Sequence, residues 1–308
     1  METNSVAIRG CAAELGESFR KLDSLQLDPN QYAELTGVYV TERLDRLAGK
    51  AAVKALASAA VAPEDIDLLL SVSALPESQL ARPTSPELLD RFSYLGTWLQ
   101  NKLDLVNART IGIGQQGCSA LFAAFEIAQA KLFSDQSIRN ILCIGADALP
   151  ATARRTIFHN VISDAAVAVV VSRAPTKYRL LGVEQLSKAY FWDTPATETQ
   201  LLATYFPSGK AVVHRLFERL GMRSTDIDAV IPTGIRRSSW PILLQLWGIP
   251  VERCLYPAEQ FGHTIQADPI LALEAAQKSG ALKTGMRLLL FTFGFGATWS
   301  AAVLEISE

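Results

Sequence analysis

The chain has 308 residues, of which 49% are hydrophobic and 19% are charged, and its formal net charge is −2. A chain of this length buries a large core and forms one large domain or two fused ones. The near-neutral charge, with no block of like charges, argues against nucleic acid and anionic membrane as partners.

The N-terminal stretch "METNSVAIRGCAAELGESFR" contains no apolar signal core, and apolar runs such as "AAVAVVVS" are too short to span a bilayer. We therefore expect a soluble protein without a membrane partner. The four cysteines form no CxxC pair and the three histidines show no zinc spacing, so we expect no metal site and a cytoplasmic chain with reduced thiols. Three cysteines are interpreted as small apolar fillers: Cys11, Cys143 and Cys254.

Two segments of the chain resemble each other. "PEDIDLLLSVSA" (Pro63–Ala74) and "STDIDAVIPTG" (Ser224–Gly234) each follow a helical pattern and lead through an Ile-Asp pair into a short apolar strand. A small-residue turn, a buried helix and another strand follow each of them. The shared order predicts two duplicated α/β halves, residues 1–173 and 176–308, with mostly parallel or mixed sheets covered by helices.

The turn and helix of the first half, "GIGQQGCSALFAAFEIAQAKLF" (Gly112–Phe133), contain Cys118, and those of the second half contain His263. Cys118 lies 25 residues before Cys143, and His263 lies 26 residues before Leu289, each target being within the closing strand of its half. If a pseudo-twofold axis relates the halves, the thiol and the imidazole face each other. A nucleophile and its base require that geometry.

Cys118 follows Gly117 at the start of a predicted helix, Ser119–Phe133. Free backbone N–H groups and the positive end of the helix dipole favour a thiolate there, which is the form that attacks a thioester. The alternative is a packed cysteine on an apolar helix, but the repeat favours the functional interpretation.

His263 precedes a second apolar helix, whose dipole disfavours a cation. We therefore expect a neutral imidazole that accepts a proton from Cys118 or from an acceptor. Asp268 lies five residues further on, directly before Pro269. It is either a helix N-cap or the carboxylate that orients the imidazole, which would complete a Cys-His-Asp arrangement; both interpretations stay open.

Four segments carry a family resemblance: "GQQGCSALFAAFEIA" around Cys118, "SDAAVAVVVS" (Ser163–Ser172), "FGHTIQADPILALEAA" (Phe261–Ala276) and "FTFGFGATWSAAVLEI" (Phe291–Ile306). From about Leu44 to its C-terminus, the chain resembles the ketoacyl-ACP synthase III-like enzymes of the thiolase superfamily. The resemblance implies an α/β, thiolase-like five-layer αβαβα fold of two duplicated halves, usually present as a homodimer.

The resemblance also implies roles for particular residues. Cys118 would take an acyl group from an acyl-CoA or from a phosphopantetheinyl carrier protein, without a tightly bound cofactor. The backbone N–H of Gly294 would bind the oxyanion. Contacts to the substrate, CoA or carrier would fall on Thr233, Arg155, Arg236 and Phe295. For each arginine, a solvated surface position is the alternative.

The sequence departs from the family pattern at two catalytic positions, since Thr233 replaces the usual histidine and His263 the usual asparagine. Condensation uses both side chains to hold the thioester carbonyl of the extender, and loss of one oxyanion-type donor costs about two to three orders of magnitude in rate. We therefore expect acyl transfer to a hydroxyl or an amine, as in specialised metabolism. Decarboxylative Claisen condensation with a malonyl-type thioester is a close alternative, and a non-catalytic subunit of a heterodimeric ketosynthase is a third.

The stretch Pro76–Ala108 is long and amphipathic, and in the family this region lines the substrate tunnel and the dimer interface. Its aromatic residues Phe92, Tyr94 and Trp98 are predicted to wall a pocket, with aromatic core packing as the alternative.

Overall fold

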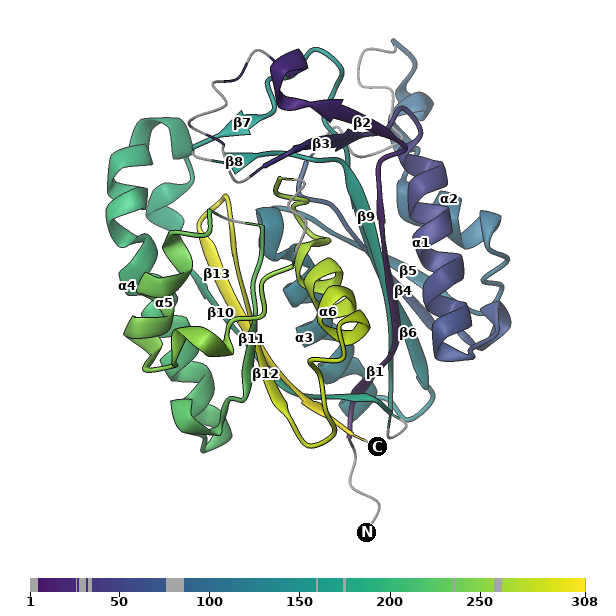
Figure 1. Ribbon diagram of the computed structural model, residues 1–308. Coiled ribbons are helices and arrows are strands. Elements are labelled where there is room, and N and C mark those ends of the chain that lie inside the picture. Colours follow the sequence, from purple (N-terminus) through teal and green to yellow (C-terminus); the bar gives the residue numbers. More distant parts are fainter. Residues whose placement is uncertain are drawn as a thin grey trace.

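The computed structural model describes residues 5–25, 27, 32, 35–75, 86–158, 160–173, 176–234, 236–257 and 262–307. Within these residues, nine strands form one mixed sheet in the order β11-β12-β13-β10-β1-β9-β6-β4-β5. In chain order these strands are β1 (Ala7–Leu15), β4 (Leu68–Val72), β5 (Arg109–Ile113), β6 (Asn140–Asp147), β9 (Ala165–Ser172), β10 (Tyr178–Ser187), β11 (Ala229–Ile231), β12 (Arg287–Gly294) and β13 (Thr298–Ile306). Two small sheets lie together at one end of the molecule (Figure 1): β2 (Ser18–Lys21) with β3 (Gly37–Val40), and β7 (Thr156–Ile157) with β8 (Asn160–Val161).

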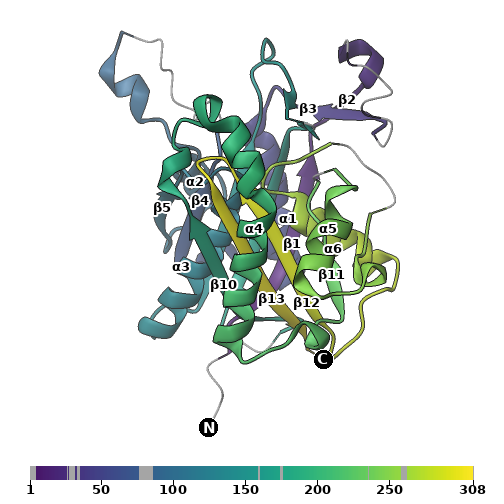
Figure 2. The same ribbon diagram turned by 90° about the vertical axis from the view of Figure 1, so that its left-hand side faces the viewer.

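Helices lie outside both parts of the large sheet and between them (Figure 1). The helices are α1 (Leu44–Ala59), α2 (Leu95–Lys102), α3 (Ala120–Ser134), α4 (Thr194–Leu220), α5 (Ser239–Trp247) and α6 (Asp268–Lys278). The helices α1 and α2 cover β1, β9, β6 and β4 from one side, α3 and α6 fill the centre, and α4 and α5 cover β10, β13 and β12 from the other side. Figure 2 shows α4 lying along the strands of its part of the sheet. The predicted five-layer αβαβα fold is therefore confirmed.

The alternation of side chains along each strand explains the layers. In β9, Val167 and Val169 lie in the central core with α3 and α6. Ala168 and Val170, which point the other way, lie in the outer core with α1. Because both faces are covered, the strand is a continuous apolar run, as is typical of buried strands.

The same order of elements occurs twice along the chain. The first run is β1, α1, β4, β5, α3, β6, β9, and the second is β10, α4, β11, α6, β12, β13. In the first run, β5 pairs with β4 in parallel. In the second run, Cys254 forms a parallel bridge with Val230 of β11 and so takes the position beside β11 that β5 takes beside β4. The predicted boundary between residues 173 and 176 falls between β9 and β10, and the division into two domains stays a prediction.

The two runs meet at the start of β1 and β10, where Ala7 pairs with Arg179 and Ile8 pairs with Tyr178. Figure 1 shows the two parts of the sheet diverging from there, with α3 and α6 between them. Each central helix therefore packs against both parts.

The two halves share one backbone feature before their central helices. Gln115 and Ile265 both have left-handed φ angles, 66° and 59°. Each lies three residues before a residue at a helix start, Cys118 in one case and Asp268 in the other. The two turns therefore share this backbone feature, and the near-equivalence of Cys118 and His263 in the two halves stays a prediction.

Candidate active site

Cys118 lies in a tight turn between β5 and α3. The backbone is left-handed at Gln115 and at Gly117, where φ is 50°, a conformation that glycine adopts at little cost. Space also requires a glycine, because a Cβ on Gly117 would lie 2.5 Å from the amide nitrogen of Phe295. The 3₁₀ turn Gly117–Ser119 then leads directly into α3, which places the cysteine at the start of a buried helix.

His263 is held by its backbone against the segment that precedes β9. Its N–H donates to the Val161 carbonyl (2.7 Å), and its own carbonyl accepts from the Ser163 N–H (3.0 Å). Gly262 allows this approach, because its φ is 80° and a Cβ there would lie 2.3 Å from the Val161 carbonyl oxygen. The first half of the chain therefore positions the histidine that the second half supplies.

The two predicted reacting groups meet. Cys118 Sγ lies 3.0 Å from Nε2 of His263, and His263 Nδ1 is hydrogen-bonded to Oδ2 of Asp268. All three side chains are buried, with 4 to 6% of each residue exposed. The arrangement is a Cys-His-Asp chain of contacts, while the catalytic roles of these residues stay a prediction.

Asp268 is fixed by donors on both of its oxygens. Oδ1 accepts from the N–H (2.7 Å) and from the hydroxyl of Thr264. Oδ2 accepts from the Gly234 N–H (2.6 Å) and faces His263. Asp268 is the first residue of α6, and Ala267 occupies the cap position without a side-chain hydrogen bond. The N-cap interpretation is therefore wrong, and the carboxylate orients the imidazole instead.

The buried charges decide the protonation of the imidazole. Burial by itself lowers the pKa of His263, but the charges of Asp268 and Cys118, with hydrogen bonds to both, raise that pKa well above its ordinary value. Burial raises the pKa of Asp268, but the His263 charge and the hydrogen bonds from His263 and Thr264 hold it below its ordinary value. The direction of the pKa shift of His263 favours an imidazolium beside the sulfur, in contrast to the expected neutral imidazole, and the protonation of the resting site stays a prediction.

The turn between β12 and β13 packs closely against the cysteine. A Cβ on Gly294 would lie 1.9 Å from the Gln116 carbonyl oxygen and 2.9 Å from the Cys118 amide nitrogen. Only glycine permits this approach of the two backbones. The backbone of Gly294 therefore lies beside the Cys118 amide, as an oxyanion-binding role requires, although that role stays a prediction.

Comparison with known proteins found similar sequences and structures. Residues 217–306 match the family model "3-Oxoacyl-[acyl-carrier-protein (ACP)] synthase III C terminal". The beta-ketoacyl-[acyl-carrier-protein] synthase III of Aquifex aeolicus (strain VF5) is 25% identical over 277 residues, covering 86% of this chain and 84% of that protein. The corresponding synthase of Coxiella burnetii (strain Dugway 5J108-111) is 37% identical over 95 residues, covering 31% of this chain and 30% of that protein.

Two solved structures share the fold. The structure named "ChlB3 [Aceyltransferase]" superposes with a TM-score of 0.83 at 22% identity, covering 98% of both chains. The 3-oxoacyl-[acyl-carrier-protein] synthase III from Aquifex aeolicus VF5 superposes with a TM-score of 0.80 at 22% identity, covering 97% of this chain and 99% of that one. The chain therefore has the fold of the 3-oxoacyl-[acyl-carrier-protein] synthase III structures, and its residues 217–306 match the C-terminal model of that family.

The structure places Arg155 in a buried ion pair with Asp164. Its guanidinium is buried and donates to both carboxylate oxygens of Asp164, at 2.8 and 3.0 Å, and to the Ile162 carbonyl at 3.1 Å. Asp164 also accepts from the Thr41 and Leu149 N–H groups. The prediction that Arg155 contacts CoA or a carrier is therefore wrong, because its donors are used to hold the loop before β9.

The other predicted substrate contacts lie in different settings. Arg236 is exposed, and Phe295 is half-buried with its ring stacked on that of Phe158 at a centroid distance of 5.1 Å. Thr233 follows β11 and is buried. Substrate contact by these three residues stays a prediction.

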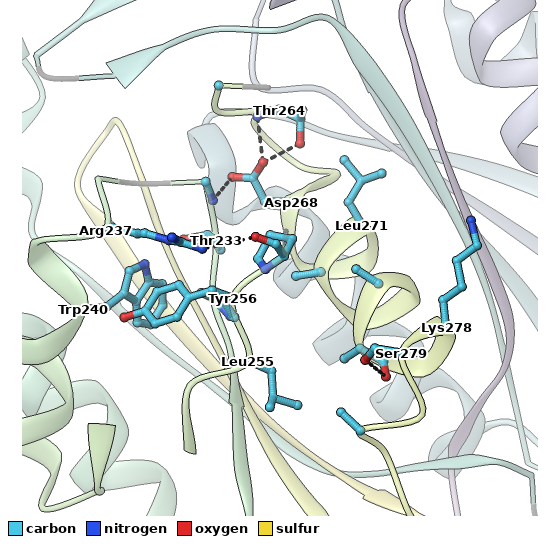
Figure 3. A pocket seen from close by; sticks show the side chains of 18 of the residues that line it. Thr233, Arg237, Trp240, Leu255, Tyr256, Thr264, Asp268, Leu271, Lys278 and Ser279 are labelled. Carbon is cyan, nitrogen blue, oxygen red and sulfur yellow. Dashed lines mark hydrogen bonds between the residues drawn. The ribbon is translucent and has the colours of Figure 1, made fainter. Parts of the chain in front are cut away.

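A cavity of about 620 Å³ lies on the Asp268 side of the site. Its wall contains Thr233, Thr264 and Asp268 at one end and runs along α6 to Lys278 (Figure 3). Cys118 contacts a different, smaller apolar cluster with Ile162 and Ile265.

Several supporting residues were not found by sequence reasoning. Gln185 of β10 donates to the Gln116 side chain (3.1 Å) and to Ser300 (2.8 Å), so it braces the cysteine turn. The Ser119 hydroxyl donates to the Thr298 carbonyl (2.8 Å). The hydroxyl of Thr264 beside His263 was the clearest signal available, because short hydroxyl side chains commonly hydrogen-bond nearby groups.

The amphipathic stretch Pro76–Ala108 was predicted to wall a pocket with its aromatic residues. Residues 76–85 of the amphipathic stretch lie outside the described residues. Farther along that stretch, Phe92 and Tyr94 are exposed, and Trp98 packs against the α1 core.

Within the described ranges, no group of three or more His, Cys, Asp or Glu side chains could hold a metal ion. No helix of the described part is both long and apolar enough to cross a membrane.

Proposed function

We propose that the chain is an acyltransferase that works through an acyl-cysteine. Cys118 accepts the acyl group of an acyl-CoA or acyl-carrier-protein thioester, and His263 activates the hydroxyl or amine that takes it. The observation that carries this proposal is the 3.0 Å contact between Cys118 Sγ and His263 Nε2, with the Asp268 carboxylate behind the imidazole.

The charges balance through both half-reactions. The Cys118 thiolate attacks the thioester carbonyl, the bond to the donor sulfur breaks, and the leaving thiolate takes a proton from the His263 imidazolium. The neutral imidazole then accepts the proton of the acceptor O–H or N–H as that atom attacks the acyl-cysteine. The Cys118 thiolate leaves, and the thiolate–imidazolium pair forms again.

Both half-reactions place negative charge on the acyl oxygen. We assign its stabilisation to the backbone N–H groups of Cys118 and Gly294, and one such donor is typically worth about 3 kcal/mol of transition-state stabilisation. The close packing of Gly294 against the Cys118 amide supports this assignment.

The side chains of His263 and Thr233 suit acyl transfer to an oxygen or nitrogen acceptor better than they suit condensation with a malonyl-type extender. Acyl transfer to oxygen or nitrogen needs one base, and His263 is in contact with the sulfur. Condensation needs a second strong donor, and Thr233 at that position has a short hydroxyl that lines the cavity on the Asp268 side. The name of the structural neighbour "ChlB3 [Aceyltransferase]" is in line with this choice.

Decarboxylative condensation is the second candidate, because curated relatives are named beta-ketoacyl-[acyl-carrier-protein] synthase III. A non-catalytic partner subunit is the third. The assembled contacts of Cys118, His263 and Asp268 argue against that third reading, since a scaffold needs no buried ion pair at this turn.

The same proposal includes the setting of the reaction. We propose a cytoplasmic homodimer that takes its acyl donor from CoA or a carrier protein, with Arg236 at the donor contact and no tightly bound cofactor. The exposed residues of β5 at the end of the sheet support pairing with a second copy, because a bare edge strand offers unpaired N–H and C=O groups.

Intact-mass spectrometry tests the proposal. The protein is incubated with a panel of acyl-CoA and acyl-carrier-protein donors, and the expected result is one acyl adduct that is absent in Cys118→Ala. Cys11→Ala is the matched control and keeps the adduct, because burial raises the pKa of the Cys11 thiol to about 12. Discharge of the adduct only to alcohols or amines supports acyl transfer, discharge to a malonyl thioester with CO₂ release supports condensation, and no adduct with any donor supports the scaffold.

A further inference from the structure

The cavity beside Asp268 has the size and lining of a small-molecule site. Its volume of about 620 Å³ lies within the range of about 300–1,000 Å³ that is usual for such sites. Leu271, Ala272, Ala275 and Ala276 of α6 form one wall, and Leu255 lies on the opposite wall (Figure 3). The middle of the cavity is therefore apolar.

The cavity is separated from the sulfur by the segment that carries His263. Gly262 and Thr264 line the cavity, whereas His263 between them contacts Cys118. Among the described residues, the lining of the cavity includes neither His263 nor Cys118. A molecule in the cavity therefore lies on the Asp268 side of the imidazole and does not contact the sulfur.

Thr233, Thr264 and Asp268 place polar side chains at the inner end, and those of Thr264 and Asp268 are already hydrogen-bonded to each other. The Asp268 carboxylate already accepts from Thr264, Gly234 and His263, which uses its lone-pair positions. Thr233 is 5% exposed as a residue, and its buried hydroxyl oxygen has no hydrogen-bond partner among the described residues. Buried hydroxyls are normally paired, so an unpaired one in a cavity wall indicates a missing partner.

Charge restricts the chemistry of that partner. A ligand carboxylate at the inner end would lie beside the carboxylate of Asp268, and like charges repel. A neutral hydroxyl can both donate to and accept from Thr233. Lys278 lies at the other end of the cavity, and the Arg237 guanidinium donates to the Pro257 carbonyl (3.3 Å) and lies over the ring of Tyr256.

We propose that this cavity is a second ligand site, which binds an uncharged apolar alcohol with its hydroxyl paired to Thr233. The site is distinct from the acyl-cysteine chamber and does not depend on which acceptor the cysteine serves.

Isothermal titration with octan-1-ol tests the proposal on the full chain. Wild-type protein is expected to bind octan-1-ol more tightly than octanoate. Thr233→Val, which keeps the shape and removes the hydroxyl, is expected to weaken binding about three- to tenfold, the range for one hydrogen bond. Thr233→Ser is expected to restore binding, which separates a lost hydrogen bond from a folding defect.

Two further variants locate the bound alcohol. Ala275→Phe fills the cavity and is expected to abolish binding, whereas Ala57→Phe adds the same bulk at an exposed position of α1 and leaves binding unchanged. Cys118→Ser is expected to bind as the wild type does. Absence of octan-1-ol binding, equal binding by Thr233→Val and Thr233→Ser, unchanged binding by Ala275→Phe, loss of binding in Cys118→Ser, or tighter binding of octanoate would each overturn the proposal.

Discussion

At the scale of single residues, Asp268 controls the charge of the site. Its carboxylate is held by Thr264 and Gly234 and faces the imidazole of His263. Without that charge, burial is the largest influence on the pKa of His263 and lowers it. The carboxylate therefore favours a proton on the imidazole, which lies 3.0 Å from Cys118 Sγ.

The substitution Asp268→Asn removes this charge and keeps the shape. We expect alkylation of Cys118 by iodoacetamide to slow about tenfold near pH 7, and its pH profile to move to higher pH, because the variant loses the imidazolium at a lower pH. The rate constant is measured from acid to alkaline pH. Asp104→Asn, at an exposed position with φ 56° that asparagine tolerates, is the control and should follow the wild-type profile.

Arg155 gives a second residue-scale prediction. Arg155→Met leaves the buried Asp164 carboxylate without its cation, which should cost about 3–5 kcal/mol of unfolding free energy in urea titrations. Arg223→Met breaks an exposed pair with Asp226 and should cost no more than about 1 kcal/mol. Equal stability of the two variants would contradict the structural role of Arg155.

The sequence predicted the reacting residues better than their surroundings. Cys118 and His263 each lie beside small residues near the start of a predicted helix, and this pattern predicted that the two side chains face each other. It was readable because helix termini and glycine turns depend on the local sequence. The partner of Arg155 was not predictable, since pairing with Asp164 depends on how the intervening loop folds back. The donors to Asp268 were also missed, because one of them is a backbone N–H from a distant loop.

At the scale of elements, the contact between the β12–β13 turn and the cysteine turn limits what the chain tolerates. Gly294→Ala places a methyl group 1.9 Å from the Gln116 carbonyl oxygen, so β12 or the cysteine turn must shift. We expect a loss of about 1–3 kcal/mol in unfolding free energy and slower formation of the acyl adduct.

The matched control for this variant is Gly49→Ala in α1, where an added methyl meets no atom within 4 Å. That change should raise the unfolding free energy by about 0.5–1 kcal/mol, because glycine is unfavourable inside a helix. Urea midpoints and adduct rates are compared for both variants. An unaffected Gly294→Ala would show that the two turns are not packed as described.

Hydrophobic patterning predicted the elements that are buried on both sides. The apolar run of β9 and the apolar helix α3 occupy the inner layers, as continuous apolar segments should. The pairing of β1 with β10 was not predictable from either strand, because register between distant strands depends on the assembled layers. The left-handed backbone at Gln115 and Ile265 was also not predictable, because neither residue is a glycine.

At the scale of the whole molecule, the buried ion pair links the site to folding. The folded pKa of His263 is raised, so its contribution to stability is complete below the unfolded value near 6.5 and is lost as pH rises through the folded value. The folded pKa of Asp268 is lowered, so its contribution is present above about 3.8 and is lost as pH falls through the folded value.

Comparison of wild-type protein with His263→Gln tests this linkage. The stability advantage of the wild type, measured by urea unfolding across pH, should be largest between about pH 4 and 6.5 and should shrink at alkaline pH. An advantage that grows as the pH rises would contradict the ion pair.

The central layer has a consequence for a nicked protein. Because α3 and α6 pack between both parts of the sheet, cleavage between β9 and β10 would leave two fragments, each with an uncovered apolar helix. One fragment would hold the thiol and the other the imidazole, so neither alone could complete the reactive pair. Recovery of cysteine reactivity on mixing would then serve as a direct reporter of fragment complementation.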